Sequence, residues 1–420
     1  MFLSNEEIKK LKQGVQHRLT IDGKTESFQS YLVPIDGLFF NDLNGRISTY
    51  IEENNNCNDS SQNLKKLLTA GKLELYNDMI ADFIKKSAND NDASYKKTKN
   101  DIRLNGQKIP GVILKDGRII DGNRRFTCLR ELYKETGDTK FAYFECVILD
   151  VPETKEQMRS IKLLELNIQF NVDEKKDYNR IDFLVSFYKD TMDSSSEDRI
   201  DKKTYCYASG LSESDYNTDK LIVETMLDYL EWRKKAKAFY ILKNEKLDGP
   251  IEEIAKKRKK WTKDEWDEMK NTIYSYMTFN NTGDRTRDLR KILDSANKGD
   301  YLYKHLKEKI ENTEFIVKLS DALDTIGKKP TSPEESKEKS QLFLDVQNPL
   351  VSAFNEGVLQ ESIQKDAEEP KKAIKSALDS LTNINQMLIY NFSQNKKDEL
   401  IKYIENIKDA LAKLEEICKK

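Results

Sequence analysis

Two adjacent arginines, Arg124 and Arg125, follow the polar turn Asp121-Gly122-Asn123 and begin a segment with helical periodicity. A cation at a helix N-terminus opposes the helix dipole, which favours negative charge there. An anion such as a phosphate chain would resolve this conflict, because backbone N–H groups and guanidinium groups would bind it together. The alternative is that both arginines pair with surface carboxylates.

The residues around this turn predict the elements that position it. Gly117 separates apolar runs at 112–114 and 119–120, which predicts a strand, a turn and a second strand ahead of Asp121. The helix after the turn has one apolar face, formed by Phe126, Leu129 and Leu132.

Apolar spacing predicts further elements on both sides of the turn. Strands are expected at Ser30–Ile35 and Phe141–Asp150, and helices at 6–16, 64–68, 73–87 and 155–168. The segment 54–63 is rich in Asn, Ser and Asp and is expected to be a surface loop, and 88–99 is a second polar stretch.

Four short motifs occur in a fixed order within residues 33–188. They are Val33–Asp36 followed by Arg46; Gly106-x-x-x-Pro110; Asp121–Arg125; and Leu166–Phe170 followed by Asp177–Asn179. In this order and spacing they resemble the ParB/sulfiredoxin-like superfamily, specifically the amino-terminal domain of ParB-type partition proteins. The third motif resembles the Gly-Glu-Arg-Arg box of that family, with Asn123 where Glu is usual.

The resemblance implies a small mixed-sheet domain that binds a nucleoside triphosphate, CTP or ATP, often with Mg²⁺. Relatives of this fold include nucleases and a small-molecule kinase, so the fold does not decide the chemistry. The resemblance assigns nucleotide contacts to Arg46, Gly106, Pro110, Gly122, Asn123, Arg124, Arg125 and Asn167.

The fourth motif departs from the family pattern. Leu166 stands where the family has a metal-associated Glu, and Phe170 stands where it has Arg. Glu165 is one residue early, so on a helix it points about 100° away from the expected direction. Mg²⁺ requires near-octahedral oxygen ligands. The changed fourth motif therefore argues against Mg²⁺ binding and nucleotide hydrolysis. Phosphate binding by Arg124 and Arg125 does not depend on the fourth motif.

Residues 202–232 match a helix–turn–helix, with Gly210 at the turn and an amphipathic second helix after it. In partition-type proteins such a motif follows the nucleotide domain at about this place. The second helix would begin with Glu213 and Asp215, which would repel DNA phosphate. A helical hairpin used only for packing is the alternative.

Two further segments are rich in cations. The first is a run of five cations at 256–260 that is followed by Trp261 and Trp266. It is a candidate nucleic-acid contact, since basic residues beside aromatic residues suit phosphate contact and base stacking. A solvated helix face is the alternative. The turn at 280–293 places three arginines at the start of a helix, for phosphate contact or for ion pairs. The five cations of the run at 256–260 are Lys256, Lys257, Arg258, Lys259 and Lys260.

The C-terminal third has a different pattern. Residues 327–340 contain two prolines and many charges, which predicts a linker or exposed loop. Apolar residues then keep a three-to-four spacing along 374–388 and 400–414, which predicts a helical hairpin. Seams of about two heptads are marginal alone. The hairpin must therefore pack on the body or on a second copy, as a homodimer.

The composition of the 420-residue chain predicts two or three domains in a helix-rich protein, with 37% hydrophobic and 34% charged residues. No apolar run is long enough for a membrane span, and the N-terminus lacks a signal-peptide pattern. Five scattered cysteines and two histidines indicate neither a zinc site nor a disulfide framework, so a cytoplasmic location is expected. The net charge of -2 excludes a uniformly basic nucleic-acid coat but not a local patch.

We therefore expect an α+β protein with a ParB/sulfiredoxin-like nucleotide-binding domain at 1–175, a mostly helical domain at 176–326 and a helical hairpin at 341–420. The first functional reading is a bacterial DNA-associated protein of plasmid or chromosome partition type, regulated by the triphosphate. The second is an enzyme on the same fold, a nuclease, a kinase or an NTPase such as a CTPase, with Asp121 and Glu165 as catalytic carboxylates. The third is a non-catalytic regulator or defence component.

Overall fold

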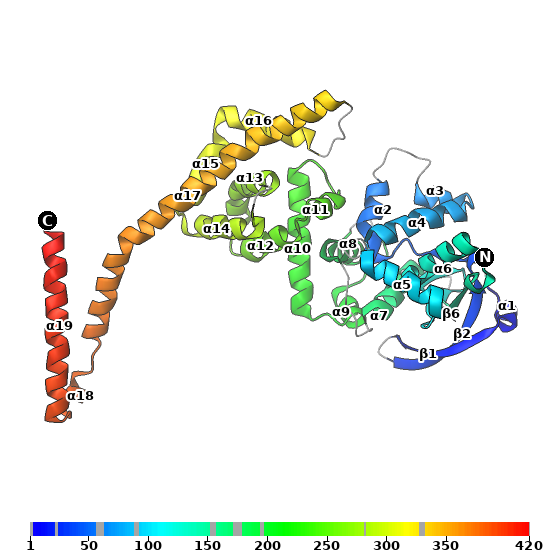
Figure 1. The fold of residues 1–420 in the computed structure, drawn as a ribbon, viewed down its shortest axis with the longest axis horizontal. Coiled ribbons are helices and arrows are strands. Elements are labelled where there is room, and N and C mark those ends of the chain that lie inside the picture. The colour runs from blue at the N-terminus through cyan, green and yellow to red at the C-terminus, as the bar shows by residue number, and fades with distance from the viewer. Residues whose placement is uncertain are drawn as a thin grey trace.

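The computed structural model has three parts in chain order: a sheet domain, a helical body and a long C-terminal arm (Figure 1). The sheet domain adjoins the helical body, and the arm extends away from the body so that the two chain ends lie at opposite ends of the molecule (Figure 1). The structure describes residues 3–21, 24–55, 63–87, 92–151, 157–170, 179–193, 197–280, 283–326 and 332–419.

A six-stranded mixed sheet forms the centre of the sheet domain, in the order β1-β2-β6-β4-β5-β3. β4 and β5 form the antiparallel pair expected on either side of Gly117, whereas β3 runs parallel to β5 and β6 parallel to β4. Because β3 and β5 are parallel, the segment after β3 lies next to the turn after β5. The strands are β1 (Gln13–Ile21), β2 (Lys24–Pro34), β3 (Phe39–Phe40), β4 (Gly111–Leu114), β5 (Arg118–Asp121) and β6 (Tyr143–Leu149).

Helices cover both faces of this sheet. On one face, Phe126 of α6 packs edge-on against Phe40 and Phe144. On the other face, Leu164 of α7 packs in a smaller core with Ile120. The helices of this domain are α1 (Asn5–Lys10), α2 (Ser48–Asn55), α3 (Leu64–Thr69), α4 (Leu73–Ser87), α5 (Asp92–Asn105), α6 (Asn123–Thr136) and α7 (Gln157–Phe170).

Two segments of the sheet domain differ from the prediction. The helix expected over 6–16 ends at Lys10, and the rest of that segment enters β1, because pairing with β2 satisfies its backbone. The polar stretch 88–99 contains most of α5, which forms because Tyr95 and Ile102 dock into the core of the domain. Residues 56–62 of the expected loop lie outside the described residues.

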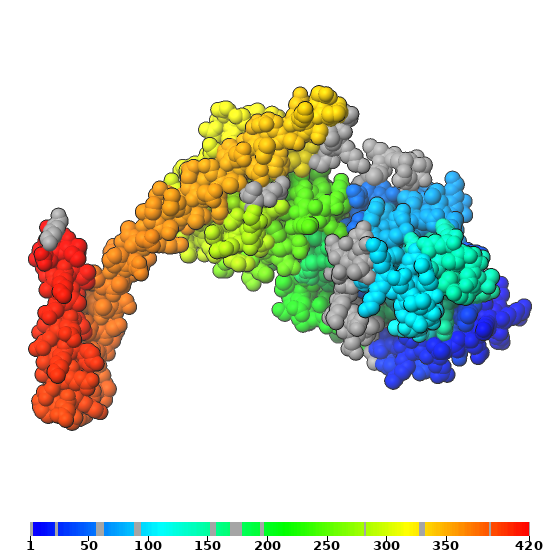
Figure 2. Space-filling model, in the orientation of Figure 1, coloured from blue at the N-terminus to red at the C-terminus, as the bar shows by residue number. Residues whose placement is uncertain are grey.

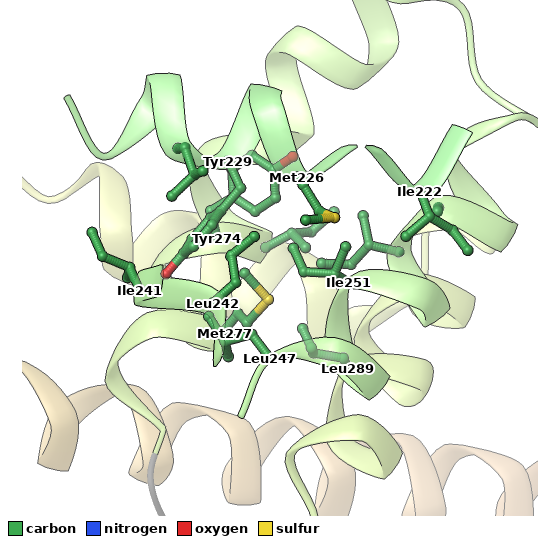
Figure 3. Packing of buried hydrophobic residues seen from close by; sticks show 14 of the residues in the cluster. Ile222, Met226, Tyr229, Ile241, Leu242, Leu247, Ile251, Tyr274, Met277 and Leu289 are labelled. Carbon is green, nitrogen blue, oxygen red and sulfur yellow. The ribbon is translucent and has the colours of Figure 1, made fainter. Parts of the chain in front are cut away.

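The helical body packs around one large apolar core (Figure 3). Met226 and Tyr229 of α10 meet Ile251 of α12 and Met277 of α13 at its centre (Figure 3). The helices are α8 (Arg180–Thr191), α9 (Lys202–Ser209), α10 (Glu213–Trp232), α11 (Tyr240–Asn244), α12 (Asp248–Arg258), α13 (Lys263–Phe279), α14 (Arg285–Lys298), α15 (Tyr301–Glu311) and α16 (Thr313–Thr325). The mostly helical region expected over 176–326 is therefore confirmed for its described residues.

A buried polar contact joins the sheet domain to the helical body. The fully buried Asp182 of α8 accepts hydrogen bonds from the Thr49 hydroxyl of α2 and, at 2.5 Å, from the Lys243 ammonium of α11. The same ammonium lies 4.0 Å from the centre of the Tyr50 ring. Burial raises the pKa of Asp182, and the Lys243 charge opposes that shift. A buried pair of this kind is costly to break, so it fixes α2 against the body.

The arm begins within one long helix. The first half of α17 (Pro333–Thr382) packs on the helical body, where Leu350 and Phe354 join its core. The boundary expected at 341 therefore falls inside a helix, and the loop expected over 327–340 is helical from Pro333 on, with Ser332 as its N-cap. Residues 327–331 lie outside the described residues. Beyond the body, α17 continues into the predicted hairpin with α18 (Gln386–Tyr390) and α19 (Gln394–Cys418).

Candidate functional site

Gly122 forms the arginine turn and is the N-cap of α6. Its φ is +92°, a left-handed value that glycine adopts without strain. A Cβ atom on Gly122 would lie 2.8 Å from the Phe144 ring and 3.1 Å from the Arg125 guanidinium. The turn therefore excludes any side chain at this position.

The first turn of α6 gathers positive potential. Glycine has no side-chain acceptor, so α6 begins without a side-chain cap, and its first turn contains no acidic residue. The backbone N–H groups of residues 123–125 lie at the positive end of the helix dipole. Arg124 and Arg125 add two guanidinium groups to the same turn. Together these groups form an arrangement that binds anions.

Each of the two arginines is held by a nearby side chain. Arg125 donates from Nη2 to the Asp121 carboxylate at 2.7 Å, and Arg124 donates from Nη1 to the Ser94 hydroxyl of α5 at 3.1 Å. Asp121, expected as a catalytic carboxylate, is therefore the ion-pair partner of Arg125. The contact with the Ser94 hydroxyl fixes the position of the Arg124 guanidinium.

Two polar atoms at the turn are buried and unpaired among the described residues. They are the amide Oδ1 of Asn123 and the guanidinium Nε of Arg125. An unpaired buried polar atom costs roughly 1–3 kcal/mol, and such atoms are rare in folded proteins. A ligand with oxygen acceptors and a hydroxyl or amino donor would satisfy both atoms.

A second polar cluster lies where β3 ends. The buried Glu165 of α7 accepts a hydrogen bond from Asn41 Nδ2 at 2.8 Å. The other amide atom of Asn41, Oδ1, lies 3.4 Å from Arg118 Nη1, which itself lies 3.6 Å from Asp42. Glu165, expected as the second catalytic carboxylate, therefore contacts the strand end after β3. Its neighbour Leu166 points about 100° away around the helix and packs in the core of the helical body.

The two residues expected from the second motif lie in different places. Pro110 is buried immediately before β4, whose Val112 pairs with Asp121, so Pro110 supports the turn from the neighbouring strand. Gly106 ends α5 and lines a cleft of about 190 Å³, to which no residue of 121–125 contributes. The structure therefore brings Pro110 to the arginine turn but does not place Gly106 in a shared cleft with it.

The last two expected nucleotide contacts, Asn167 and Arg46, lie on α7 and in the 3₁₀ turn after β3. The buried Asn167 donates from Nδ2 to the Leu163 carbonyl of its own helix at 3.0 Å. Arg46 lies in the 3₁₀ turn Gly45–Ile47, which packs against α8. Residues 171–178, which include Asp177 of the fourth motif, lie outside the described residues.

Several kinds of site are absent from the described part of the chain. No three Asp, Glu, His or Cys side chains there meet in a cluster that could hold a metal ion. Over the same ranges, no helix combines the length and apolarity needed to cross a membrane. The described cysteines, Cys128, Cys146, Cys206 and Cys418, are free thiols.

The basic run at the end of α12 is divided between the interior and the surface. Arg258 lies over the Trp266 ring at 5.1 Å, and Trp266 is buried with its Nε1–H donating to Asp228 at 2.7 Å. Lys257 pairs with Asp294 at 2.5 Å. Trp266 is therefore closed to base stacking, and the exposed cations of the run are Lys256, Lys259 and Lys260.

Residues 202–232 fold as two helices, α9 and α10, as both the helix–turn–helix and the packing hairpin require. Gly210 joins them with a left-handed φ of +68°, and Tyr216 packs at the junction against aromatic side chains of α8 and α9. The first turn of α10 exposes Glu213 and Asp215. This end of α10 therefore carries negative charge at the surface.

Sequence reasoning missed His17, which lies on β1. Burial lowers the pKa of His17, and the Arg125 charge lowers it further, while Asp121 and Glu145 oppose the shift. The charges of Arg125 and Asp121 therefore act on this part of β1. No local signal could have shown this effect, because β1 and the turn are distant in the chain.

Comparison of the chain with protein-family models, curated proteins and solved structures finds no match. No activity can therefore be taken from a relative. The function rests on the geometry of the arginine turn and on the surfaces around it.

Proposed function

We propose that this protein binds the phosphate groups of a nucleoside triphosphate, CTP or ATP, at the N-terminus of α6. The bound nucleotide regulates DNA binding by the helical body, in the manner of ParB-type partition proteins. The observation that carries the proposal is the turn at Gly122, which has no side-chain cap, two arginines and an unpaired Arg125 Nε.

Phosphate binding requires a movement of the Arg125 side chain, because its unpaired Nε is buried. Arg125 uses Nη2 to hold Asp121, and its unpaired Nε–H remains to donate to a phosphate oxygen. Arg124, positioned by Ser94, and the N–H groups of the first turn supply further donors. Mg²⁺ that accompanies the nucleotide would be held chiefly by phosphate oxygens and water.

A rigid connection supports the proposed regulation. The segment after β3 carries Arg46 and continues directly into α2, whose Thr49 binds the buried Asp182 of the helical body. α7 adds a second connection, since Glu165 contacts the sheet domain and Leu166 packs in the body. A nucleotide that moves the segment after β3 would therefore shift the helical body.

The proposed DNA contact is the exposed part of the basic run, Lys256, Lys259 and Lys260. These lysines can neutralise phosphates without reading base sequence. The acidic first turn of α10 favours this location over α10 itself, because DNA phosphates would be repelled there. A phosphoryl-transfer enzyme has less support, since Asp121 and Glu165 are each engaged by another side chain.

The first test is nucleotide binding by the full chain. CTP, ATP, GTP and ADP are titrated by calorimetry with and without Mg²⁺ and duplex DNA, and released phosphate is followed in the same samples. We expect triphosphate binding that Arg124→Ala with Arg125→Ala abolishes while the melting temperature stays unchanged. Unaltered affinity in the double variant would overturn the proposal, and Mg²⁺-dependent turnover would favour the enzyme.

The second test is the salt dependence of DNA binding. Lys256→Ala, Lys259→Ala and Lys260→Ala together should lower the slope of log affinity against log salt by about 2–3. A matched control replaces three exposed lysines of the arm, Lys371, Lys372 and Lys375, with Ala. Equal slopes in the two triple variants would remove the basic run from the DNA contact.

A further inference from the structure

The arm leaves a long apolar surface uncovered. α19 has no buried residue, and the described side chains of α17 and α18 beyond Glu361 are not buried either. Sixteen large apolar side chains of the described residues between Leu359 and Ile417 each expose 38–77% of their surface. Together they present on the order of 1,000 Å², more than the ~300–600 Å² of the largest patch on an ordinary monomer.

Seven of these side chains belong to two apolar seams that follow the heptad spacing of helical bundles, with alternating steps of four and three residues. In α19 the positions are Leu400, Ile404, Ile407, Leu411, Leu414 and Cys418. In α17 they are Ile363, Ala367, Pro370, Ile374, Ala377 and Leu381. Each helix of the arm therefore carries a seam that is suited to packing against other helices.

The arm has the form of half a four-helix bundle. After α18 the chain reverses, so that α19 runs opposite to α17 at the end of the molecule (Figures 1 and 2). Two helices alone leave their apolar seams open on one side, whereas four close them around a common core. Because α17 is continuous with the helical body, it holds the seams away from the rest of the described chain (Figure 2).

The charges of the arm indicate which partner fits it. Residues 362–418 contain nine Lys and ten Asp or Glu, so the surface is nearly neutral but densely charged with both signs. A nucleic acid or a strongly acidic or basic protein would find no net attraction there. A second copy of the same balanced surface would meet opposite charges beside its apolar seam.

We propose that two copies of this protein associate through their arms, with the α17 and α19 helices of both copies closing one four-helix bundle. The exposed apolar area of the arm is of the same order as the ~800 Å² per partner that a standard interface buries. A two-fold symmetric pair covers the same surface on both copies. This association depends on neither nucleotide nor DNA.

The test is the mass of the full chain in solution, by light scattering and sedimentation at tens of micromolar. We expect twice the mass of one chain. Ile404→Asp with Leu411→Asp should weaken the dimer at least about 100-fold, because the bundle core would bury charge. Lys402→Glu with Asp409→Lys, on the opposite face of α19, is the matched control and should leave the dimer intact.

A second seam variant separates lost contacts from an unfolded helix. Ile404→Ala with Leu411→Ala keeps strong helix propensity while it removes apolar area, so it should also weaken the dimer with circular dichroism unchanged. A monomeric wild-type chain would overturn the proposal. A dimer that persists in both seam variants would also overturn it. The same holds if the opposite-face variant dissociates the dimer as strongly as the seam variants do.

Discussion

Two helices of this protein begin at arginine-rich turns, and the two N-termini are capped in opposite ways. At α14 the Asp284 carboxylate accepts a hydrogen bond from the Arg287 backbone N–H at 3.0 Å and brings negative charge to the helix dipole. At α6 the N-cap is Gly122, which supplies neither an acceptor nor a charge. The first turn of α6 therefore retains the positive potential that α14 neutralises.

The arginines of the two turns differ in the same way. At α14, Arg290 pairs with Glu253 at 3.0 Å, and Arg285 lies 3.4 Å from the Glu245 carbonyl. One arginine of that turn is therefore held by an ion pair and another by a backbone carbonyl, as the ion-pair alternative predicts for Arg290 only. At α6, Arg125 keeps a buried unpaired Nε beside its ion pair. The comparison teaches that the N-cap residue, rather than the number of arginines, distinguishes an open turn from a closed one.

The largest expected effect is a difference in triphosphate affinity between variants of the two turns. Arg124→Ala with Arg125→Ala removes two charge-assisted hydrogen bonds to phosphate, each about 1.5–3 kcal/mol, so triphosphate affinity should fall by at least about 100-fold. Arg285→Ala with Arg287→Ala removes the same charge from α14 and should leave the affinity unchanged. Calorimetric titration measures both variants. Equal losses would mean that overall charge, and not the open turn, binds the nucleotide.

The second prediction concerns the loss of stability when the glycine of each turn, Gly122 or Gly283, is replaced by alanine. Gly122→Ala should lower the free energy of unfolding by about 2–4 kcal/mol, because a left-handed backbone and contact with Phe144 both oppose the methyl group. Gly283 has a φ of +71° but no described atom within 4 Å of its Cβ position, so Gly283→Ala should cost only about 1 kcal/mol. Urea unfolding of both variants tests the difference, and equal costs would contradict the crowding at Gly122.

The third prediction removes the cap of α14. Asp284→Ala should lower the free energy of unfolding by about 1 kcal/mol, because the Arg287 N–H loses its acceptor. Asp284→Asn keeps an acceptor oxygen and should cost less. Chemical denaturation of both variants provides the measurement. A fully stable Asp284→Ala protein would show that the cap does not close this turn.

The smallest expected effect is a pH dependence at α14. The hydrogen bond from Arg290 lowers the pKa of Glu253 below its ordinary value, although burial opposes the shift. The pair therefore stabilises the fold above that ordinary value, and the stabilisation is lost as the pH falls through the lowered pKa. At neutral pH the Arg290→Gln variant should melt slightly below the wild-type protein. In acid, below the lowered pKa of Glu253, the two proteins should have the same melting temperature. Arg287→Gln, which replaces a neighbouring exposed arginine, should show no such pH-dependent gap.

Local elements around the candidate site followed from periodicity. The spacing of apolar residues predicted α4 at its observed bounds and the β4–β5 pair around Gly117, because amphipathic spacing and a turn glycine are local signals. The same reasoning missed α5 and all of β1. α5 is strongly polar and depends on Tyr95 and Ile102 docking into a distant core, and β1 depends on pairing with β2.

By itself, the sequence determined that two arginines follow a glycine at the start of a helix, since helix dipole and glycine backbone freedom are local properties. It also determined the two heptad seams of the arm, which depend only on spacing. Only the tertiary structure decided that Ser94 positions Arg124, that Glu165 binds Asn41, and that the arm lies beyond the reach of the body. Those contacts join segments far apart in the chain, and long-range packing sets them.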